Sequence, residues 1–264
     1  MRRSLLIAVI AALGITGAAY AASKVTNHYV LKAKVTPIKS GTKQHPTPIG
    51  TQISYTVSAV PTGDRPNVVK SEDVTIQGVQ ANTNDFKGCD TSRLINPSEG
   101  PSTCPKGSQI GTGYFMAEIG PSSSQSSKTE VTCRVDLTVF NGTNHKIIYY
   151  IYRNAANKNE CPATPDLPTT MVASLKETNA GLVQSFTIPE HVRHPTVAGS
   201  NVALDSAAVS TVVQIPAATT TVKNHKVGLV ESISCPTNHQ RHIAITFKLE
   251  NGTSETATRL VPCS

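Results

Sequence analysis

The 264-residue sequence is short of the side chains on which many enzymes and sugar-binding proteins depend. It contains no tryptophan, 5% aromatic residues and only 17 aspartates and glutamates. Glycoside hydrolysis needs two carboxylates held a short distance apart, and these scattered acids nominate no pair. No window repeats apolar residues at i, i+3 and i+4 between helix caps, so we predict almost no helix.

Motifs of common catalytic and binding sites are missing or out of context. G-x-S-x-G and a D-x-D-x-D-G calcium loop are absent, and the S-x-x-K match at 40–43 lacks its companion motifs. The glycines of Gly107–Gly113 precede a strand pattern, whereas a phosphate loop opens a helix, so a strand bulge explains them better. No neighbouring Asp, Glu or Cys completes a ligand set for the H-x-x-H pairs at 191–194 and 239–242. We therefore predict no catalytic, cofactor-binding or metal-binding residue.

What the sequence does contain is the alternation typical of half-buried strands. Val131–Arg153 alternates apolar and polar residues, reaches the hairpin-forming pair Asn141-Gly142, and continues as an apolar run at Ile147–Tyr152. A second hairpin is predicted at Asn251-Gly252. The other predicted strands are 28–35, 52–60, 72–79, 109–119, 170–175, 181–188, 202–215, 222–234, 242–249 and 255–261.

Short strands punctuated by glycine, proline and asparagine predict an all-β fold, an antiparallel β-sandwich that is either one large or two small. Residues 22–128 and 129–264 would form two β-rich halves joined by the serine-rich segment 120–128, or together one continuous sandwich. The segment 80–106 has almost no apolar periodicity, and we expect Phe86 and Leu94 to anchor it on the core.

The N-terminus carries the pattern of a secretory signal peptide. Arg2 and Arg3 precede an apolar stretch, and Ala19-Tyr20-Ala21 is a small-x-small cleavage signal, so we predict a signal peptide over residues 1–21. The alternative is an uncleaved membrane anchor over residues 5–22. No second apolar run occurs near the C-terminus, so we expect an exported protein with no transmembrane segment after signal removal, secreted or associated with the cell envelope.

The formal net charge is +7, and its excess lies near the N-terminus. Two readings stay open: a basic face that attracts anionic envelope polymers, or lysines that keep an edge strand from pairing with another chain. Nucleic acid is not an expected partner, because no basic run with interleaved aromatic residues occurs. Another exported protein remains a possible partner. The lysines that precede the first carboxylate are Lys24, Lys32, Lys34, Lys39 and Lys43.

Six cysteines in an exported chain favour three disulfides over metal ligands. Six cysteines allow fifteen pairings, so the connectivity is open. Pairing neighbours along the sequence would give Cys89–Cys104, Cys133–Cys161 and Cys235–Cys263.

Tyrosines gather in the apolar strand Ile147–Tyr152. Tyr150 and Tyr152 fall on one face of that strand and could form an exposed stacking platform. Packing in the core is the alternative, and it is the commoner use of strand tyrosines.

Two stretches resemble a known group of proteins. Cys89–Gly113 reads C-x14-C-P-x-x-S-x-I-G-x-G, and the C-terminus reads Cys235-Pro, then I-T-F-K-L-E-N-G-T, then Cys263. Together they resemble exported, disulfide-bearing, β-rich proteins of high-GC Gram-positive bacteria with no known activity. The resemblance implies export, β-rich architecture and disulfides, and it implies no catalytic or binding residue.

These observations predict a non-enzymatic exported protein with a binding or structural role at the cell envelope. One alternative is a hydrolase of envelope glycans or lipids, with a site built from the loops 80–106 and 154–168. Another alternative is a carrier of a small ligand, which requires an apolar cavity between the sheets.

Overall fold

The structure, a computed structural model, describes five stretches of the chain. The predicted signal peptide, residues 1–21, lies outside them, as does Cys161. The described residues are 25–95, 100–122, 127–153, 167–196 and 201–264.

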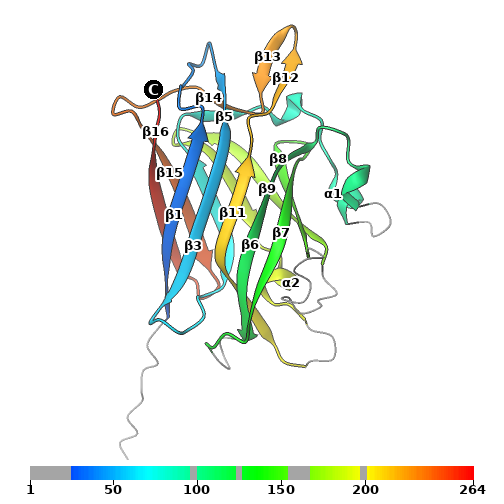
Figure 1. Ribbon diagram of the computed structural model, residues 1–264, viewed down its shortest axis with the longest axis vertical. Coiled ribbons are helices and arrows are strands. Elements are labelled where there is room, and N and C mark those ends of the chain that lie inside the picture. Colours follow the sequence, from blue (N-terminus) through cyan, green and yellow to red (C-terminus); the bar gives the residue numbers. More distant parts are fainter. Residues whose placement is uncertain (1–24, 96–99, 123–126, 154–166, 197–200) are drawn as a thin grey trace, which may run out of the picture.

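Eleven strands form one antiparallel sheet that curls until its two outermost strands lie side by side (Figure 1). The all-β, antiparallel prediction is confirmed, and the opposite faces of the expected sandwich are opposite walls of a single, nearly closed barrel. In spatial order the strands are β1 (Thr26–Thr36), β3 (Gly50–Val60), β11 (Leu204–Ile215), β6 (Gln109–Pro121), β7 (Val131–Asn141), β8 (Lys146–Tyr152), β9 (Thr169–Thr178), β10 (Gly181–Thr187), β4 (Val69–Ile76), β15 (Gln240–Leu249) and β16 (Ser254–Pro262).

Strands from both predicted halves, 22–128 and 129–264, interleave in this sheet. β11 lies between β3 and β6, and β4 lies between β10 and β15. The described helices are short, in agreement with the prediction. They are α1 (Thr91–Leu94), α2 (Glu190–Arg193) and the 3-10 turns η1 (Thr83–Asp85) and η2 (Gly100–Thr103).

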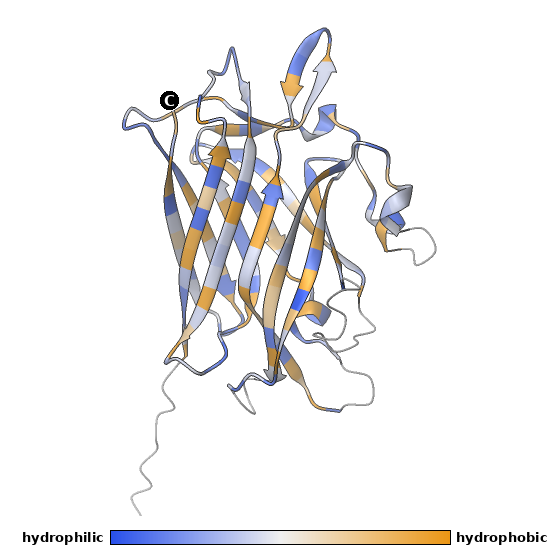
Figure 2. Cartoon of the chain, viewed as in Figure 1, coloured by the Kyte–Doolittle hydropathy of each residue, from blue (hydrophilic) through white to orange (hydrophobic). Residues whose placement is uncertain are grey.

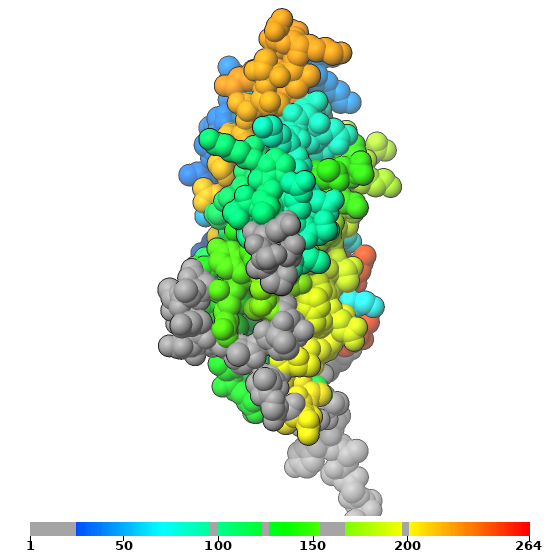
Figure 3. Space-filling model, turned by 90° about the vertical axis from the view of Figure 1, so that its right-hand side faces the viewer, coloured from blue at the N-terminus to red at the C-terminus, as the bar shows by residue number. Residues whose placement is uncertain are grey.

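Short strands gather at the upper end of the barrel as drawn in Figure 1. A small sheet there consists of β2 (Thr47–Pro48), β14 (Val230–Ser232) and β5 (Val79–Ala81). Beside it the hairpin of β12 (Thr219–Val222) and β13 (His225–Gly228) projects from the molecule (Figures 1 and 3).

The prediction of one strand over 222–234 is therefore wrong. Lys223 and Asn224 take positive φ values of 47° and 66° and turn the chain back on itself. Both central residues of this turn are left-handed, which suits the twist of a two-residue hairpin.

The central hairpin forms where it is predicted, but its turn lies three residues later. Positive φ values occur at Asn144 and His145, and not at Asn141-Gly142. Asn141 is instead fully buried at the end of β7, where its Nδ2 donates to the carbonyl oxygens of Thr83, Phe86 and Lys87 at 2.9, 3.3 and 3.2 Å. This asparagine thus anchors the segment that precedes α1.

Alternation along the strands decides what faces the interior (Figure 2). In β3, Tyr55, Val57 and Ala59 are buried and the residues between them are exposed. The inward side chains form two packed clusters on opposite sides of the lumen, one mainly from β1, β3, β4, β15 and β16 and one mainly from β6 to β9 and β11. Leu175 and Val230 pack against both clusters.

The barrel closes at a seam between β1 and β16. Because the sheet has an odd number of strands, each antiparallel to its neighbour, β1 and β16 run in the same direction. No strand pairing joins these two described strands. Above them, the Ser264 amide donates to the Ile38 carbonyl at 3.0 Å, and the Ser40 amide donates to the Ser264 carbonyl at 2.6 Å.

Two of the three predicted disulfide pairs are present. Cys89–Cys104 ties the two ends of the segment around α1 and η2, and Leu94 is fully buried beneath it, as expected. Cys235–Cys263 joins the end of β16 to the connection before β15. The third predicted pair, Cys133–Cys161, includes a residue outside the described ranges.

Candidate ligand-binding lumen

The barrel encloses two apolar cavities, of about 90 Å³ and about 70 Å³. The upper cavity lies under the small sheet, where Ala81 of β5 and Val230 of β14 line it. The lower cavity extends to α2, where Val192 and Arg193 line it. Both cavities lie between the two core clusters, so the lumen is not completely filled by side chains.

A belt of residues from five strands lines both cavities, which meet there. Because each member touches both spaces, a molecule in either cavity contacts this belt. Its members are Tyr55, Glu72, Tyr149, Phe186, Thr211 and Val213.

Glu72 is the acidic member of the belt, and only 4% of its surface is exposed. On β4 it lies opposite Phe247 of β15 and Phe186 of β10, so it points into the barrel. Burial raises the pKa of the Glu72 carboxyl to about 7, and the hydrogen bond from Tyr55 opposes that rise. The Tyr55 hydroxyl donates to Glu72 Oε1 at 2.5 Å. Within the described chain this is the only hydrogen bond of the carboxyl.

A second polar pair joins β8 to β10, the strand next to β4 in the sheet. Gln184 Nε2 donates to the Tyr149 hydroxyl. Burial raises the pKa of Tyr149 to about 12, and the bond from Gln184 opposes the rise. The lumen thus contains two hydrogen-bonded pairs, Tyr55 with Glu72 and Gln184 with Tyr149, in mostly apolar surroundings.

Aromatic rings surround this polar centre. Phe247 stacks on Tyr29 with ring centroids 3.9 Å apart and meets Tyr55 edge-on at 5.0 Å. Beside Glu72, the ring of Phe186 on β10 lies 5.8 Å from that of Tyr149 on β8. Rings packed in this way fix one another, which holds the Tyr55 hydroxyl on Glu72.

The lower end of the barrel is held by a network of charged side chains, which we call the α2 latch: Arg65, Arg193, His194, Asp205 and Glu250. Arg193 forms an ion pair with Glu250. His194 lies between two carboxylates, with Nδ1 3.1 Å from Asp205 and Nε2 2.9 Å from Glu250. Arg65, which is 2% exposed, lies 3.5 Å from Asp205.

The latch connects α2 to β11 and to the turn between β15 and β16. Asp205 belongs to β11, and Glu250 begins that turn. Because carboxylates contact both imidazole nitrogens of His194, neither nitrogen faces a serine or cysteine nucleophile. The α2 latch is therefore a structural network, which holds α2 over the lower cavity.

The two histidines of the 191–194 pair contact different partners. His191 contacts Thr169 Oγ1 at 2.9 Å, and His194 belongs to the α2 latch. No three His, Cys, Asp or Glu residues among those described are grouped to hold a metal. Gly111 follows a bulge in β6, as predicted.

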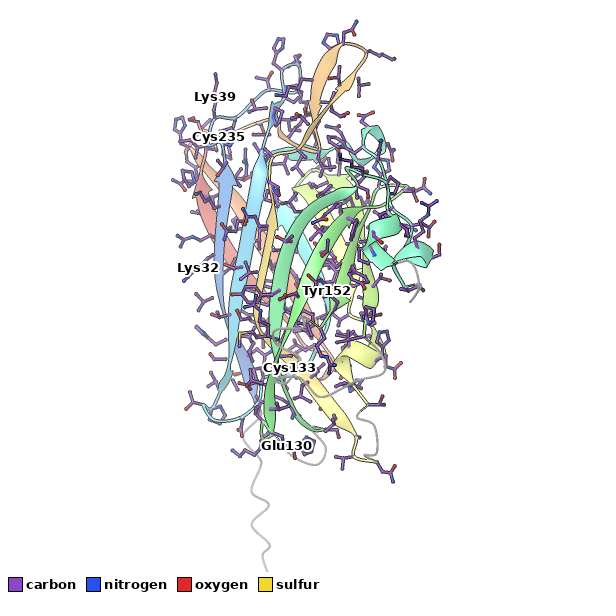
Figure 4. All side chains as sticks on the ribbon, turned by 45° about the vertical axis from the view of Figure 1, so that its right-hand side comes forward. Lys32, Lys39, Glu130, Cys133, Tyr152 and Cys235 are labelled. Carbon is purple, nitrogen blue, oxygen red and sulfur yellow. A yellow bond between two sulfur atoms is a disulfide. The ribbon has the colours of Figure 1, made fainter. Side chains whose placement is uncertain are left out.

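On the outer wall, Tyr150 is buried at 8% exposure and stacks with Tyr152 at 5.5 Å. Both rings pack with Leu94 and the Cys89–Cys104 segment, so packing, and not an exposed platform, is their role. Lys32 and Lys34 are exposed on β1 beside the seam, and Figure 4 shows Lys32 pointing away from the barrel.

Sequence reasoning missed Glu72, although a signal for it exists. Val74 and Ile76 face inward on β4, and Glu72 has the same parity. A carboxyl on the apolar face of a strand is a candidate functional group.

Comparison of the chain with protein-family models, with curated proteins and with solved structures gave no match. What the fold and the site define is a class: a nearly closed antiparallel barrel around an apolar lumen that contains one buried carboxyl.

Proposed function

We propose that this protein is an exported carrier of a small, largely apolar molecule that it holds inside the barrel. The observation on which the proposal rests is the pair of apolar cavities that meet at the Glu72 belt. Small-molecule sites are concave and mostly apolar, with few polar groups that fix orientation. Of the functions that the sequence leaves open, a carrier is the one that requires such an interior.

Export is supported by the signal pattern of residues 1–21 and by the two disulfides, which persist in oxidising compartments. None of the described helices is long and apolar enough to cross a membrane. We place the protein outside the cytoplasm, secreted or at the cell envelope. A binding role toward envelope polymers through Lys32 and Lys34 remains a separate prediction.

The size of the cavities bounds the ligand. An apolar cavity of about 150 Å³ holds benzene, and the two cavities here measure about 90 and 70 Å³. Together they are about the size of the benzene cavity, so a ligand that spans both would have about six to eight non-hydrogen atoms.

Filling the lumen tests the proposal. Val213 lines both cavities, so Val213→Phe should occupy the space and abolish binding of toluene measured by titration calorimetry. Val212 lies one residue away on β11 with opposite parity, and Val212→Phe is the matched control that should leave toluene binding intact. Toluene binding that survives Val213→Phe, or no binding by the native chain, contradicts the proposal.

A further inference from the structure

Glu72 is a buried acid without a counterion among the described residues. Within the described part of the chain no basic side chain acts on its carboxyl; burial and the Tyr55 hydroxyl alone set its pKa. Burying a carboxylate without a partner is unfavourable, so the carboxyl either takes up a proton or is stabilised by a cation that enters the lumen.

Aromatic rings complete the surroundings of this carboxyl. Tyr55, Tyr149 and Phe186 line both cavities together with Glu72. Ring faces attract cations, and most strongly where water is excluded. One carboxylate among several aromatic rings is the chemistry that recognises an organic ammonium group.

We infer that the lumen binds a small protonated amine, with its ammonium group against Glu72 and the belt rings and its apolar body in the cavities. The inference rests on the proposed function and names the ligand class of that same site. Glu72 would be the residue that determines specificity, because it lines both cavities and its Oε2 has no hydrogen-bond partner among the described residues.

The other ionisable groups near Glu72 do not change the expected preference for a cationic over an anionic ligand. Arg193 lines the lower cavity but is paired with Glu250. The remaining ionisable neighbours are Tyr29, Tyr55, Tyr149 and, beside Tyr29, Glu255. Burial raises the pKa of the tyrosines, which stay neutral in the physiological range. A carboxylic acid would place a second negative charge beside Glu72 in surroundings of low polarity and is therefore disfavoured.

Four probes of nearly equal size separate these possibilities: benzylamine, benzyl alcohol, toluene and benzoate, titrated by calorimetry into the full chain at pH 8 and pH 5.5. At pH 8 we expect benzylamine to bind about tenfold more tightly than benzyl alcohol. The advantage should vanish at pH 5.5, because Glu72 is then protonated while the amine keeps its charge. Benzoate should bind most weakly at pH 8.

Glu72→Gln should abolish the preference for benzylamine and leave toluene binding within about twofold, because only the charge is lost. Asp73→Asn is the matched control; Asp73 follows Glu72 on β4 but pairs with Lys248 outside the lumen, so the preference should persist. If Glu72→Gln does not fold, the pH dependence of the native chain decides.

The outcomes distinguish the two proposals. Benzylamine binding no tighter than benzyl alcohol at pH 8, or a preference that survives Glu72→Gln, overturns the amine inference. If toluene and benzyl alcohol bind and benzylamine does not, the carrier proposal stands and the amine inference fails. If none of the four binds, both fail.

Discussion

Glu72 occupies a position that the alternation of β4 would otherwise give to an apolar residue. A group whose pKa differs between the folded and the unfolded chain makes the free energy of unfolding depend on pH. Here the folded value, about 7, lies above the ordinary value of 4.5. The folded chain therefore binds the proton more tightly, and stability falls as pH rises between those values.

We predict that the free energy of unfolding is about 2 to 3 kcal/mol lower at pH 8 than at pH 5 through Glu72 alone. Glu72→Gln should remove that part of the difference, as measured by urea unfolding at both pH values. Asp73→Asn should not, because hydrogen bonds and Lys248 lower the pKa of Asp73 and its titration lies below pH 5. An unchanged pH dependence in Glu72→Gln would show that the carboxyl is solvated.

Asn141 and Asn251 start identical N-G-T triplets but have different roles. Asn141 is fully buried and donates to three carbonyl groups, whereas Asn251 is exposed and accepts from the amide of Thr253 at 3.0 Å. Asn141→Ala should lower the free energy of unfolding by about 2 to 3 kcal/mol, because buried carbonyls lose their donor. Asn251→Ala should cost about 0.5 kcal/mol. Equal losses in urea unfolding would contradict the anchoring role.

At the scale of elements, α2 is a single helical turn that depends on its neighbours. Glu250→Gln removes the charge that faces Arg193 and His194, so the end of α2 should open more often. We predict that the amides of Val192 and His194, which donate to Pro189 and Glu190, exchange with solvent about tenfold faster.

Hydrogen exchange followed by NMR checks this prediction. Asp136→Asn is the control, because it breaks another ion pair, with Arg134, on β7. Exchange at α2 that is unaffected by Glu250→Gln would mean that packing of Val192, and not the charge network, holds the helix.

Strand positions were predictable because period-2 alternation is local. The inward residues of β3, including Tyr55 and Val57, follow directly from it. The turns were less predictable: Asn141-Gly142 has the composition of a tight turn, yet burial of the Asn141 amide moves the turn to Asn144 and His145. Tertiary hydrogen bonds overrode a local preference.

At the scale of the whole molecule, closure into a barrel could not be read from the sequence, because strand order is not a local property. β11, from the second half of the chain, inserts between β3 and β6, which both come from the first half. The belt around Glu72 draws on five strands brought together by that order. The sequence alone therefore predicts that Glu72 lies on the inward face of β4, but it does not predict which aromatic rings surround it.

The seam is the least bonded part of the wall, and Cys235–Cys263 lies at its upper end. Replacing both cysteines by serine should lower the free energy of unfolding by about 3 to 4 kcal/mol, from the 28-residue separation in the loop-entropy description. Urea unfolding under oxidising conditions measures the change. A loss below about 1 kcal/mol would mean that side-chain packing between β1 and β16 holds the seam without the disulfide.

The central claim, an accessible apolar lumen around Glu72, is tested most directly by methyl NMR during a titration with toluene. We predict that methyl groups facing the lumen, such as those of Ile53 and Val74, shift and show contacts to the toluene ring, whereas those of the outward Val30 and Leu260 do not. Shifts confined to the outward methyl groups, or absent throughout, would contradict the account.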